Sequence, residues 1–306
     1  MTHVAIYFSN PRPDGPPFDH GGYREAYHGL ARELLARGAT CTFVRGKETF
    51  LGKGTFAGGW CFDEAGNLHE DRGPIRADVV YNKGEDFQAD AETCLINHPA
   101  LDALCRNKKR TLEQFPLFLP RAVLCESREE LHMRLAHIPP ATRVVAKPPD
   151  RWGGQGVIID VPSRIMESAC SFPILLQEFV DTSEGIHGLC SGTHDLRCFV
   201  ISGTIALCSI RLPPARTFVA NIAQGAAIIL VPTEQVPDEP RRIVGEIDRS
   251  FEQYGTRIYS VDFGRSISGR FYVFELNSQP GLTAPHRGPG TLHLYEAVAQ
   301  ALITAC

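Results

Sequence analysis

Two carboxylates and a carboxamide end two apolar, strand-like stretches near the C-terminus. Asp262 lies in "IYSVDFG" (258–264), and Glu275 and Asn277 lie in "FYVFELNSQPG" (271–281). Because side chains alternate along a strand, Glu275 and Asn277 share a face, which Asp262 joins if the two strands are antiparallel neighbours. Carboxylate and amide oxygens suit Mg²⁺, which also takes substrate phosphates as ligands. The pattern predicts a metal site, although polar strand ends that face water are the commoner explanation when it is taken alone.

A lysine and a glycine-rich loop form a second pattern, "VVAKPPDRWGGQGV" (144–157). Lys147 ends an apolar strand, where its amine can reach a phosphate as a point charge. The glycines Gly153, Gly154 and Gly156 allow backbone N–H groups to approach phosphate oxygens closely. A plain long hairpin is the alternative, because no helix opens directly after the loop, as Walker A and Rossmann loops require.

Two strand-like segments carry arginines. In "HDLRCFVI" (194–201), Asp195 and Arg197 share a face, and Arg211 ends the partner segment "TIALCSIR" (204–211). The "SG" between the two segments predicts a tight hairpin turn. Paired arginines beside a metal can hold a phosphate or carboxylate bidentately, whereas isolated arginines are more often surface residues.

A polar pair, Gln177 and Glu178, interrupts the apolar segment "PILLQEFVD" (173–181). This pattern is typical of a domain edge that hydrogen-bonds adenine through its backbone. As a bare pattern, it is equally a strand with one polar pair.

The predicted secondary structure differs between the first third of the chain and the rest. Strands at 4–8, 40–44 and 77–82 and a helix at 23–37 indicate an open, largely parallel sheet, with irregular structure or a small hairpin at 45–75. The helix should bury Tyr23, Tyr27, Leu30, Ala31, Leu34 and Leu35. Helices at 99–115 and 238–254 accompany further strands, which indicates α+β structure; these strands are 143–147, 156–161, 173–180, 194–201, 204–211, 258–264 and 271–277.

Composition excludes several classes of function. The 306 residues carry a net charge of -4, so nucleic acid and anionic membranes are not expected partners. No apolar run reaches the ~20 residues of a membrane helix, and the N-terminus lacks a signal peptide, so a cytoplasmic location is expected. The 10 cysteines show no paired short spacing, which argues against structural zinc.

Taken in order, these motifs resemble the ATP-grasp superfamily, above all the group of bacterial glutathione synthetase and the RimK-like glutamate ligases. The resemblance runs from about Asn97 to Gly281 and is strongest from "HDLR" to "VFELNSQPG". It implies an ATP-grasp fold of α/β and α+β parts. An open parallel-sheet domain at 1–98 would precede a lid subdomain at 99–181 and a C-terminal subdomain with the metal site at 182–306, and the last two would grip ATP.

The resemblance also implies a role for each matching residue. Lys108 and Lys147 would contact phosphate under a flexible lid at 151–156, and Gln177, Glu178 and Val180 would contact adenine. Asp262, Glu275 and Asn277 would hold Mg²⁺, with Mn²⁺ as the alternative, while Arg197, Arg211 and Asn221 would lie near the γ-phosphate and acyl group. The acid that holds the ribose is open between Glu184 and Asp181, because segment 182–192 is longer than the family pattern.

The implied activity is ATP-dependent ligation of a carboxylate to an amine through an acyl phosphate, with ADP and phosphate released. An amino acid, a short peptide or a natural-product precursor would be the substrate, and relatives of this kind are commonly homo-oligomers. His20, Tyr23, Arg24, His286 and Arg287 are candidates for the substrate end. The alternatives are a phosphotransferase that acts on a hydroxyl and a nucleotide-binding regulator without catalysis.

Overall fold

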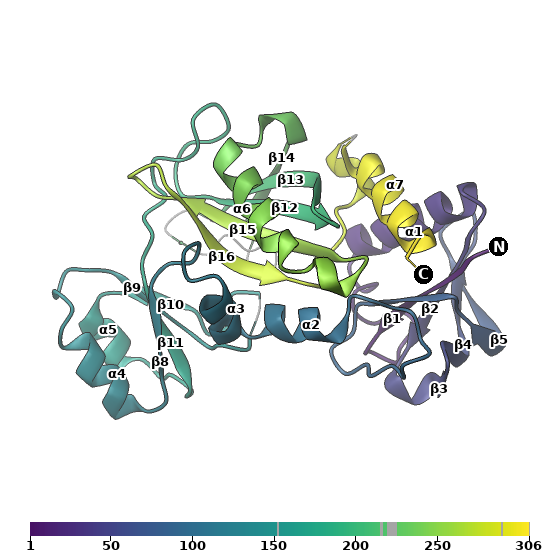
Figure 1. The fold of residues 1–306 in the computed structure, drawn as a ribbon, viewed down its shortest axis with the longest axis horizontal. Helices are drawn as coiled ribbons and strands as arrows, with labels where there is room; N and C mark the ends of the chain where they lie inside the picture. The colour runs from purple at the N-terminus through teal and green to yellow at the C-terminus, as the bar shows by residue number, and fades with distance from the viewer. Residues whose placement is uncertain (152, 215–216, 219–224, 289, 306) are drawn as a thin grey trace.

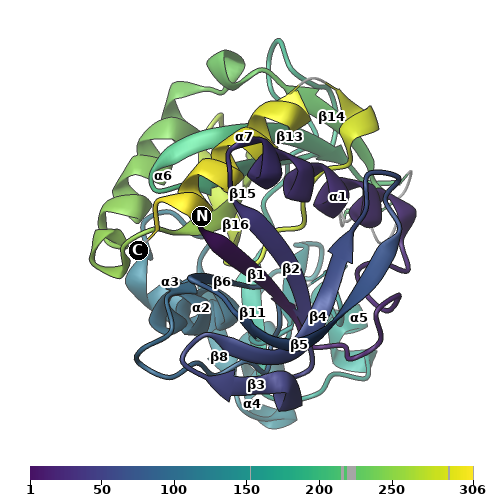
Figure 2. The same cartoon turned by 90° about the vertical axis from the view of Figure 1, so that its right-hand side faces the viewer.

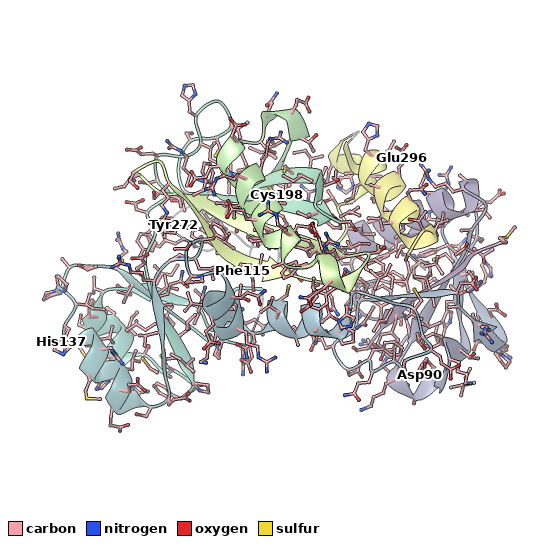
Figure 3. All side chains as sticks on the ribbon, viewed as in Figure 1. Asp90, Phe115, His137, Cys198, Tyr272 and Glu296 are labelled. Atoms are coloured by element: carbon pink, nitrogen blue, oxygen red, sulfur yellow. The ribbon has the colours of Figure 1, made fainter. Side chains whose placement is uncertain are left out.

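Three β-sheets, one from each third of the chain, form the framework of the protein (Figure 1). This computed structural model describes residues 1–306 except 152, 215–216, 219–224, 289 and 306. The sheets fall within the ranges 1–98, 99–181 and 182–306, and the third sheet lies between the other two. Phe115 and Cys198 lie in this central part, whereas Asp90 and His137 lie toward opposite ends of the molecule (Figure 3).

The N-terminal sheet has a parallel centre of four strands in the order β2-β1-β6-β7. These strands are β1 (His3–Phe8), β2 (Thr40–Arg45), β6 (Val79–Asn82) and β7 (Leu95–Ile96). Alternation along β1 sends Val4, Ile6 and Phe8 to one core and Ala5 and Tyr7 to another on the opposite face. The predicted open, largely parallel sheet is therefore confirmed in its centre.

For 45–75, where irregular structure or a small hairpin was predicted, the structure has antiparallel hairpins that extend the sheet. They consist of β3 (Phe50–Gly52), β4 (Thr55–Phe62) and β5 (Leu68–Arg76), and β4 pairs with β2. On one face of the sheet, α1 (Gly21–Ala36) packs beside the C-terminal helix α7 (Gly290–Ile303) (Figure 2). The C-terminal helix α7 thus packs against the N-terminal sheet.

The second sheet is antiparallel, with the order β10-β9-β11-β8. Its strands are β8 (Ala122–Cys125), β9 (Val144–Lys147), β10 (Ile158–Asp160) and β11 (Ile174–Glu178). Helices α4 (Arg128–Leu135) and α5 (Pro162–Glu167) contribute Leu131, Leu135 and Ile165 to a small core on the sheet. Neither helix was predicted, because both are short.

The third sheet is also antiparallel, with the order β14-β13-β12-β15-β16. Its strands are β12 (Asp195–Ile201), β13 (Thr204–Leu212), β14 (Ala227–Val231), β15 (Ile258–Arg265) and β16 (Phe271–Asn277). The predicted turn at 202–203 is confirmed by positive φ angles at Ser202 and Gly203. One face packs on α2 (Pro99–Arg106), α3 (Lys108–Gln114) and α6 (Asp238–Arg249), which leaves the polar face for the site.

Some predictions for the helices were wrong in detail. Leu35 is 65% exposed, because α1 buries only the narrower stripe of Ala26, Tyr27, Leu30 and Leu34. The helix predicted at 99–115 breaks at Asn107, whose extended backbone ends α2 and whose side chain accepts N–H bonds at the start of α3. The helix predicted at 238–254 ends at Arg249 and is followed by a 3-10 turn at Glu252–Tyr254.

Candidate active site

A cavity of about 700 Å³ lies where the polar face of the third sheet meets the second sheet and the N-terminal domain. Most of the predicted site residues line it, namely Lys108, Lys147, Gly153, Gly154, Gln177, Glu178, Val180, Arg197, Arg211, Asp262, Glu275 and Asn277. Gly156 and Glu184 are not among the lining residues, and Asn221 lies outside the described residues. One space thus gathers motifs that are dispersed over the sequence.

Asp262, Glu275 and Asn277 project from paired positions of β15 and β16. The two strands are antiparallel neighbours, as predicted, with Asp262 opposite Glu275 and Ser260 opposite Asn277. A register shift follows the Asp262 pair, so Phe263 pairs with Val273 and Phe274 is the additional residue in β16. The three oxygen-bearing side chains therefore reach the same cavity while Val261 and Phe263 remain in the core.

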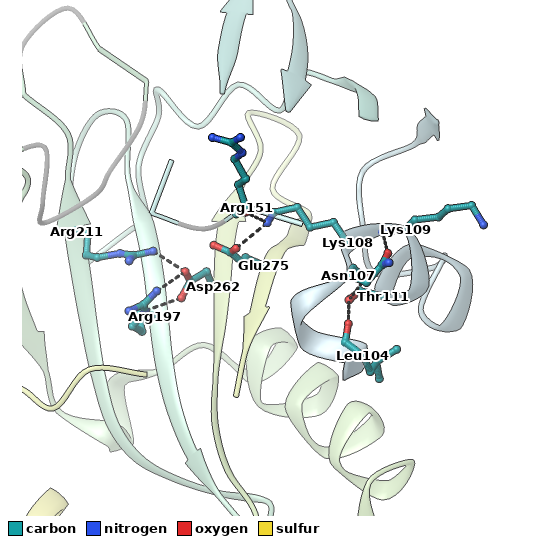
Figure 4. A network of polar contacts seen from close by, with 10 residues as sticks. All are labelled: Leu104, Asn107, Lys108, Lys109, Thr111, Arg151, Arg197, Arg211, Asp262 and Glu275. Atoms are coloured by element: carbon teal, nitrogen blue, oxygen red, sulfur yellow. Dashed lines mark hydrogen bonds and ion pairs between the residues drawn. The ribbon is translucent and has the colours of Figure 1, made fainter. Parts of the chain in front are cut away.

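Two arginines from the neighbouring strands hold Asp262 (Figure 4). Arg197 donates from Nε and Nη2 to the two carboxylate oxygens at 2.7 Å each, and Arg211 Nη2 lies 2.6 Å from Oδ2. Burial alone would raise the pKa of Asp262, but these two guanidinium groups outweigh it and hold the pKa below its ordinary value. Asp262 is therefore an ionised carboxylate despite being 2% exposed.

Lys108 approaches Glu275 from the opposite side, with Nζ 3.1 Å from Oε1 (Figure 4). The helix break at Asn107 makes Lys108 the first residue of α3, and its backbone N–H donates to Pro149 O at 2.8 Å. Its side chain also donates to the carbonyl of Arg151. Lys108 thus connects β16, the strand that carries Glu275, to the glycine-rich loop. The helix break at Asn107 gives Lys108 this position.

Lys147 ends β9 and is buried beneath the same loop. Burial, reinforced by the nearby charge of Lys108, lowers the pKa of Lys147 to about 8. A bound phosphate would offset both effects. In the loop itself, Gly153 and Gly154 have positive φ angles and line the cavity, whereas a Cβ on Gly156 would lie 2.9 Å from the ring of Pro148.

In the predicted adenine-contacting segment at the end of β11, some polar groups already make hydrogen bonds within the protein. The backbone N–H of Glu178 donates to Arg121 O, and its carboxylate accepts from Arg121 N, each at 2.9 Å. These two hydrogen bonds connect Glu178, at the end of β11, to Arg121, which precedes β8. Val180 follows it, and Val145, Ile159, Phe179, Phe218 and Phe274 supply apolar lining on this side of the cavity.

Asp195 is a cavity acid that the predicted site did not include. Its Oδ2 accepts from Arg211, and its Oδ1 has no hydrogen-bond partner although it is buried. Burial, only partly opposed by Arg211, raises the pKa of Asp195 above its ordinary range. By contrast, Glu184 and Asp181, the two acids considered for a ribose, are exposed and absent from the cavity lining.

The N-terminal domain closes the other end of the cavity. Ser9 and Asn10 after β1, His20 and Tyr23 at the start of α1, and Lys83 after β6 line this end. Lys83 was not among the predicted site residues, although its position directly after a predicted strand could have indicated it. His286 lies outside the lining and contacts Glu25 at 3.2 Å, and Arg287 is likewise absent from it.

Positive and negative charges are nearly balanced in the cavity. Among the described lining residues, the cations are Lys83, Lys108, Lys147, Arg151, Arg197 and Arg211, and the acids are Glu85, Glu178, Asp195, Asp262 and Glu275. The cations exceed the acids by one, which is too little to neutralise a triphosphate. A nucleotide triphosphate would therefore need divalent cations to accompany it into this site.

The oxygen ligands fit such a cation in type and placement. Asp262, Glu275 and Asn277 line one cavity from adjacent strands, and Mg²⁺ commonly uses one or two carboxylates together with phosphate oxygens. Within the described residues, no group of three or more His, Cys, Asp and Glu side chains forms a metal site by itself. The site thus depends on the amide of Asn277 and on oxygens that a ligand brings.

This arrangement of three sheets around one shared cavity is that of an ATP-grasp fold. A family model described as the RimK-like ATP-grasp domain matches residues 105–295, more than half of the chain. The chain therefore belongs to the RimK-like ATP-grasp family, and the resemblance noted from its motifs is confirmed.

Two curated relatives carry the name "Probable alpha-L-glutamate ligase". The protein from Shewanella halifaxensis is 30% identical over 135 residues, covering 42% of this chain and 26% of the relative. The protein from Thioalkalivibrio sulfidiphilus is 28% identical over 196 residues, covering 61% of this chain and 60% of the relative. The chain thus spans less than two thirds of the length of these relatives.

Solved structures extend the likeness to the whole fold. D-alanyl-alanine synthetase A from Vibrio cholerae aligns over 99% of this chain and 98% of its own, with a TM-score of 0.66 and 15% sequence identity. At this identity the comparison shows the fold alone, and it confirms the predicted ATP-grasp architecture. No helix within the described residues combines the length and apolarity needed to span a bilayer.

Proposed function

We propose that the protein is an ATP-dependent carboxylate–amine ligase that forms an amide bond through an acyl-phosphate intermediate. The observation that carries this proposal is the meeting of oxygen ligands, two arginines and two lysines in one cavity. The glutamate-ligase names of two relatives and the ligase name of the structural neighbour support the same class of reaction. An amino acid, a short peptide or a natural-product precursor is the substrate class we expect.

The nucleotide would lie between the second and third sheets. Its base would occupy the apolar hinge side near Val180, and Lys108 and Lys147 would contact its phosphates beneath the loop of Gly153 and Gly154. Asp195 accepts a hydrogen bond from Arg211, so it would lie at the phosphate and acyl end of the ligand, where its Oδ1 is available to accept a further hydrogen bond.

Asp262, Glu275 and Asn277 would hold Mg²⁺ or Mn²⁺, and the bound ion would neutralise charge on the terminal phosphates during transfer. The chain's own residues supply orientation and further charge stabilisation. Asp262 fixes Arg197 and Arg211 by direct hydrogen bonds, so both guanidinium groups are already ordered before a substrate arrives. Such preorganised donors are worth more than flexible ones, because they need no rearrangement during the reaction.

The proposed reaction has two steps, phosphoryl transfer to the substrate carboxylate and then amide formation. An oxygen of the substrate carboxylate forms a bond to the γ-phosphorus as the bond to the β–γ bridging oxygen breaks, and ADP leaves. The amine nitrogen next forms a bond to the acyl carbon, the acyl phosphate C–O bond breaks, and phosphate and the amine's proton leave. Arg197 and Arg211 are placed to stabilise the acyl phosphate and the tetrahedral intermediate, and the loop at 151–156 would exclude water.

The test is a screen of amino acids and dipeptides for ADP release that requires both an acid and an amine, with mass spectrometry of the product. We expect an amide product with equal yields of ADP and free phosphate. ADP with a stable phosphate ester and no free phosphate would instead identify a hydroxyl phosphotransferase. Stabilisation by MgATP without turnover of any acid or amine would identify a nucleotide-binding regulator and contradict the proposal.

A further inference from the structure

The carboxyl ends of β1 and β6 lie at the switch point of the N-terminal sheet. The chain leaves β1 for β2 on one side and later returns to β6 on the other side, and both neighbours are parallel to β1. In open parallel sheets, ligands bind outside the carboxyl ends of strands at such a point. Ser9 and Asn10 directly follow β1, Lys83 directly follows β6, and all three line the cavity.

Lys83 places an ammonium group at this point with few partners. Its Nζ donates to Pro280 O at 2.7 Å and, more weakly, to the Tyr81 hydroxyl at 3.5 Å, and it lies 5.0 Å from the centre of the Tyr81 ring. In the described part of the chain, no ion pair joins this ammonium to an aspartate or glutamate. Burial, with Asp102 only partly opposing it, lowers the pKa of Lys83 to about 7. An ammonium group can donate three hydrogen bonds, so Lys83 retains capacity for an anion.

Polar side chains line the cavity at the same end as Lys83, and Arg197 and Asp102 are charged groups close enough to act on its pKa. Tyr23 packs against Gly281, next to the Pro280 carbonyl that holds Lys83, since a Cβ on Gly281 would lie 2.7 Å from the Tyr23 hydroxyl. The side chains of Asn10 and His20 complete this end of the cavity. A single ammonium group suits a singly charged carboxylate better than a phosphate.

The reacting groups have a different location. Arg197 and Arg211, which are placed to receive the phosphorylated carboxylate, project from the third sheet, whereas Lys83 projects from the N-terminal domain. A substrate with two anionic groups can therefore contact Lys83 with one group and the arginines with the other.

We propose that Lys83 binds a substrate carboxylate other than the one that is phosphorylated, so that this end of the cavity selects substrates with a free, non-reacting carboxylate. The inference rests on the proposed ligase function, and it adds a specificity-determining residue and the chemical group which that residue recognises. The carboxylate can belong to the acid or to the amine substrate, and kinetics separate the two sources.

The experiment uses the ADP-release screen with wild type, Lys83→Met and Lys83→Arg. It compares each amino acid in the amine role with its own carboxamide, and each dicarboxylic amino acid in the acid role with the monoamide that keeps the reacting carboxylate. We expect wild type to prefer the free carboxylate by roughly 10- to 100-fold in kcat/KM, the range of a charge-assisted hydrogen bond. Lys83→Met should reduce this preference to within about threefold through a rise in the KM of one substrate, whereas Lys83→Arg should retain most of it. The substrate whose KM rises is the one that carries the carboxylate.

The matched control is Lys53→Met, because Lys53 is an exposed lysine that pairs with Glu92 at 3.0 Å outside the cavity. It should leave the preference unchanged. A Lys83→Met enzyme that keeps the wild-type preference would overturn the proposal, and so would a fall in kcat with both KM values unchanged, which would indicate proton transfer.

A binding measurement keeps the two proposals distinguishable. Thermal shifts are recorded with the same acids and carboxamides in the presence of Mg²⁺ and a non-hydrolysable ATP analogue. Carboxylate-selective stabilisation that Lys83→Met abolishes, without amide formation by wild type, would support the subsite and contradict the ligase function. Amide formation with no carboxylate preference in either assay would support the ligase and overturn the subsite.

Discussion

Two buried aspartates of the third subdomain are held by arginines in nearly the same way, but only one of them lines the cavity. Asp248, in α6, accepts from Arg257 Nε at 2.7 Å and from Tyr259 Oη at 3.0 Å, and Arg257 Nη2 contacts its second oxygen. Arg257 also donates to Gly255 O at 2.8 Å. This network satisfies its donors and acceptors internally, and none of these residues lines the cavity of the candidate site.

Asp262 repeats the bidentate contact with Arg197 and adds Arg211, but its network is incomplete. Arg211 Nε and Asp195 Oδ1 are buried without hydrogen-bond partners among the described residues, and the Arg197 side chain keeps 20% of its surface exposed. Buried polar groups are normally paired, so the unpaired atoms indicate a place where a ligand completes the network. A buried ion pair therefore does not by itself indicate function; its unused hydrogen-bonding capacity beside a cavity does.

The largest effect should come from Asp262→Asn. Loss of this charge removes a proposed metal ligand and the anchor of Arg197 and Arg211, so kcat should fall by about 10²- to 10³-fold, the range for loss of one preorganised group. Steady-state ADP release, measured well below the unfolding temperature, checks this. Wild-type kcat in this variant would contradict the proposed site.

The same substitution in the closed network, Asp248→Asn, should act on stability instead. Breaking the buried pair leaves Arg257 without its carboxylate and should lower the free energy of unfolding by about 3 kcal/mol. Denaturant unfolding measures the loss, and kcat per folded molecule should be unchanged. A large loss of kcat in folded Asp248→Asn would remove the distinction between the two networks.

Lys147 should make nucleotide affinity depend on pH. Since the pKa of Lys147 is lowered to about 8 without ligand, raising the pH through 8 neutralises the amine and removes its attraction for phosphate. The Kd for MgATP should therefore rise above pH 8, by up to about tenfold per pH unit. Calorimetric titration across this range checks the direction. Lys147→Arg, which stays charged, should show a flat profile, and the same rise in that variant would exclude Lys147 as its cause.

The smallest effects should separate the two candidate acids near the nucleotide. Asp195→Asn should weaken MgATP binding by roughly tenfold, because it alters a buried group in the cavity. Glu184→Gln should leave the Kd within about twofold of wild type, because Glu184 is exposed outside the cavity. The reverse order of effects would restore Glu184 as the ribose acid.

Local patterns predicted much of this molecule. The strand around Asp262, the strand that ends in Glu275 and Asn277, and the turn at 202–203 were all readable, because side-chain alternation and turn chemistry involve only a few neighbouring residues. Short elements such as β8, α4 and α5 were not predicted, because their patterns are too brief to separate from irregular structure.

By itself, the sequence determined which oxygen-bearing side chains share a strand face, since a period of two residues depends on the backbone alone. Only the tertiary structure decided their partners. The break at Asn107 brings Lys108 to Glu275, the hairpin β12–β13 brings Arg211 to Asp262, and the packing of the N-terminal sheet on the turn at Pro280 brings Lys83 into the cavity. These contacts join residues far apart in the chain, and the packing of domains, rather than any local preference, determines such distances.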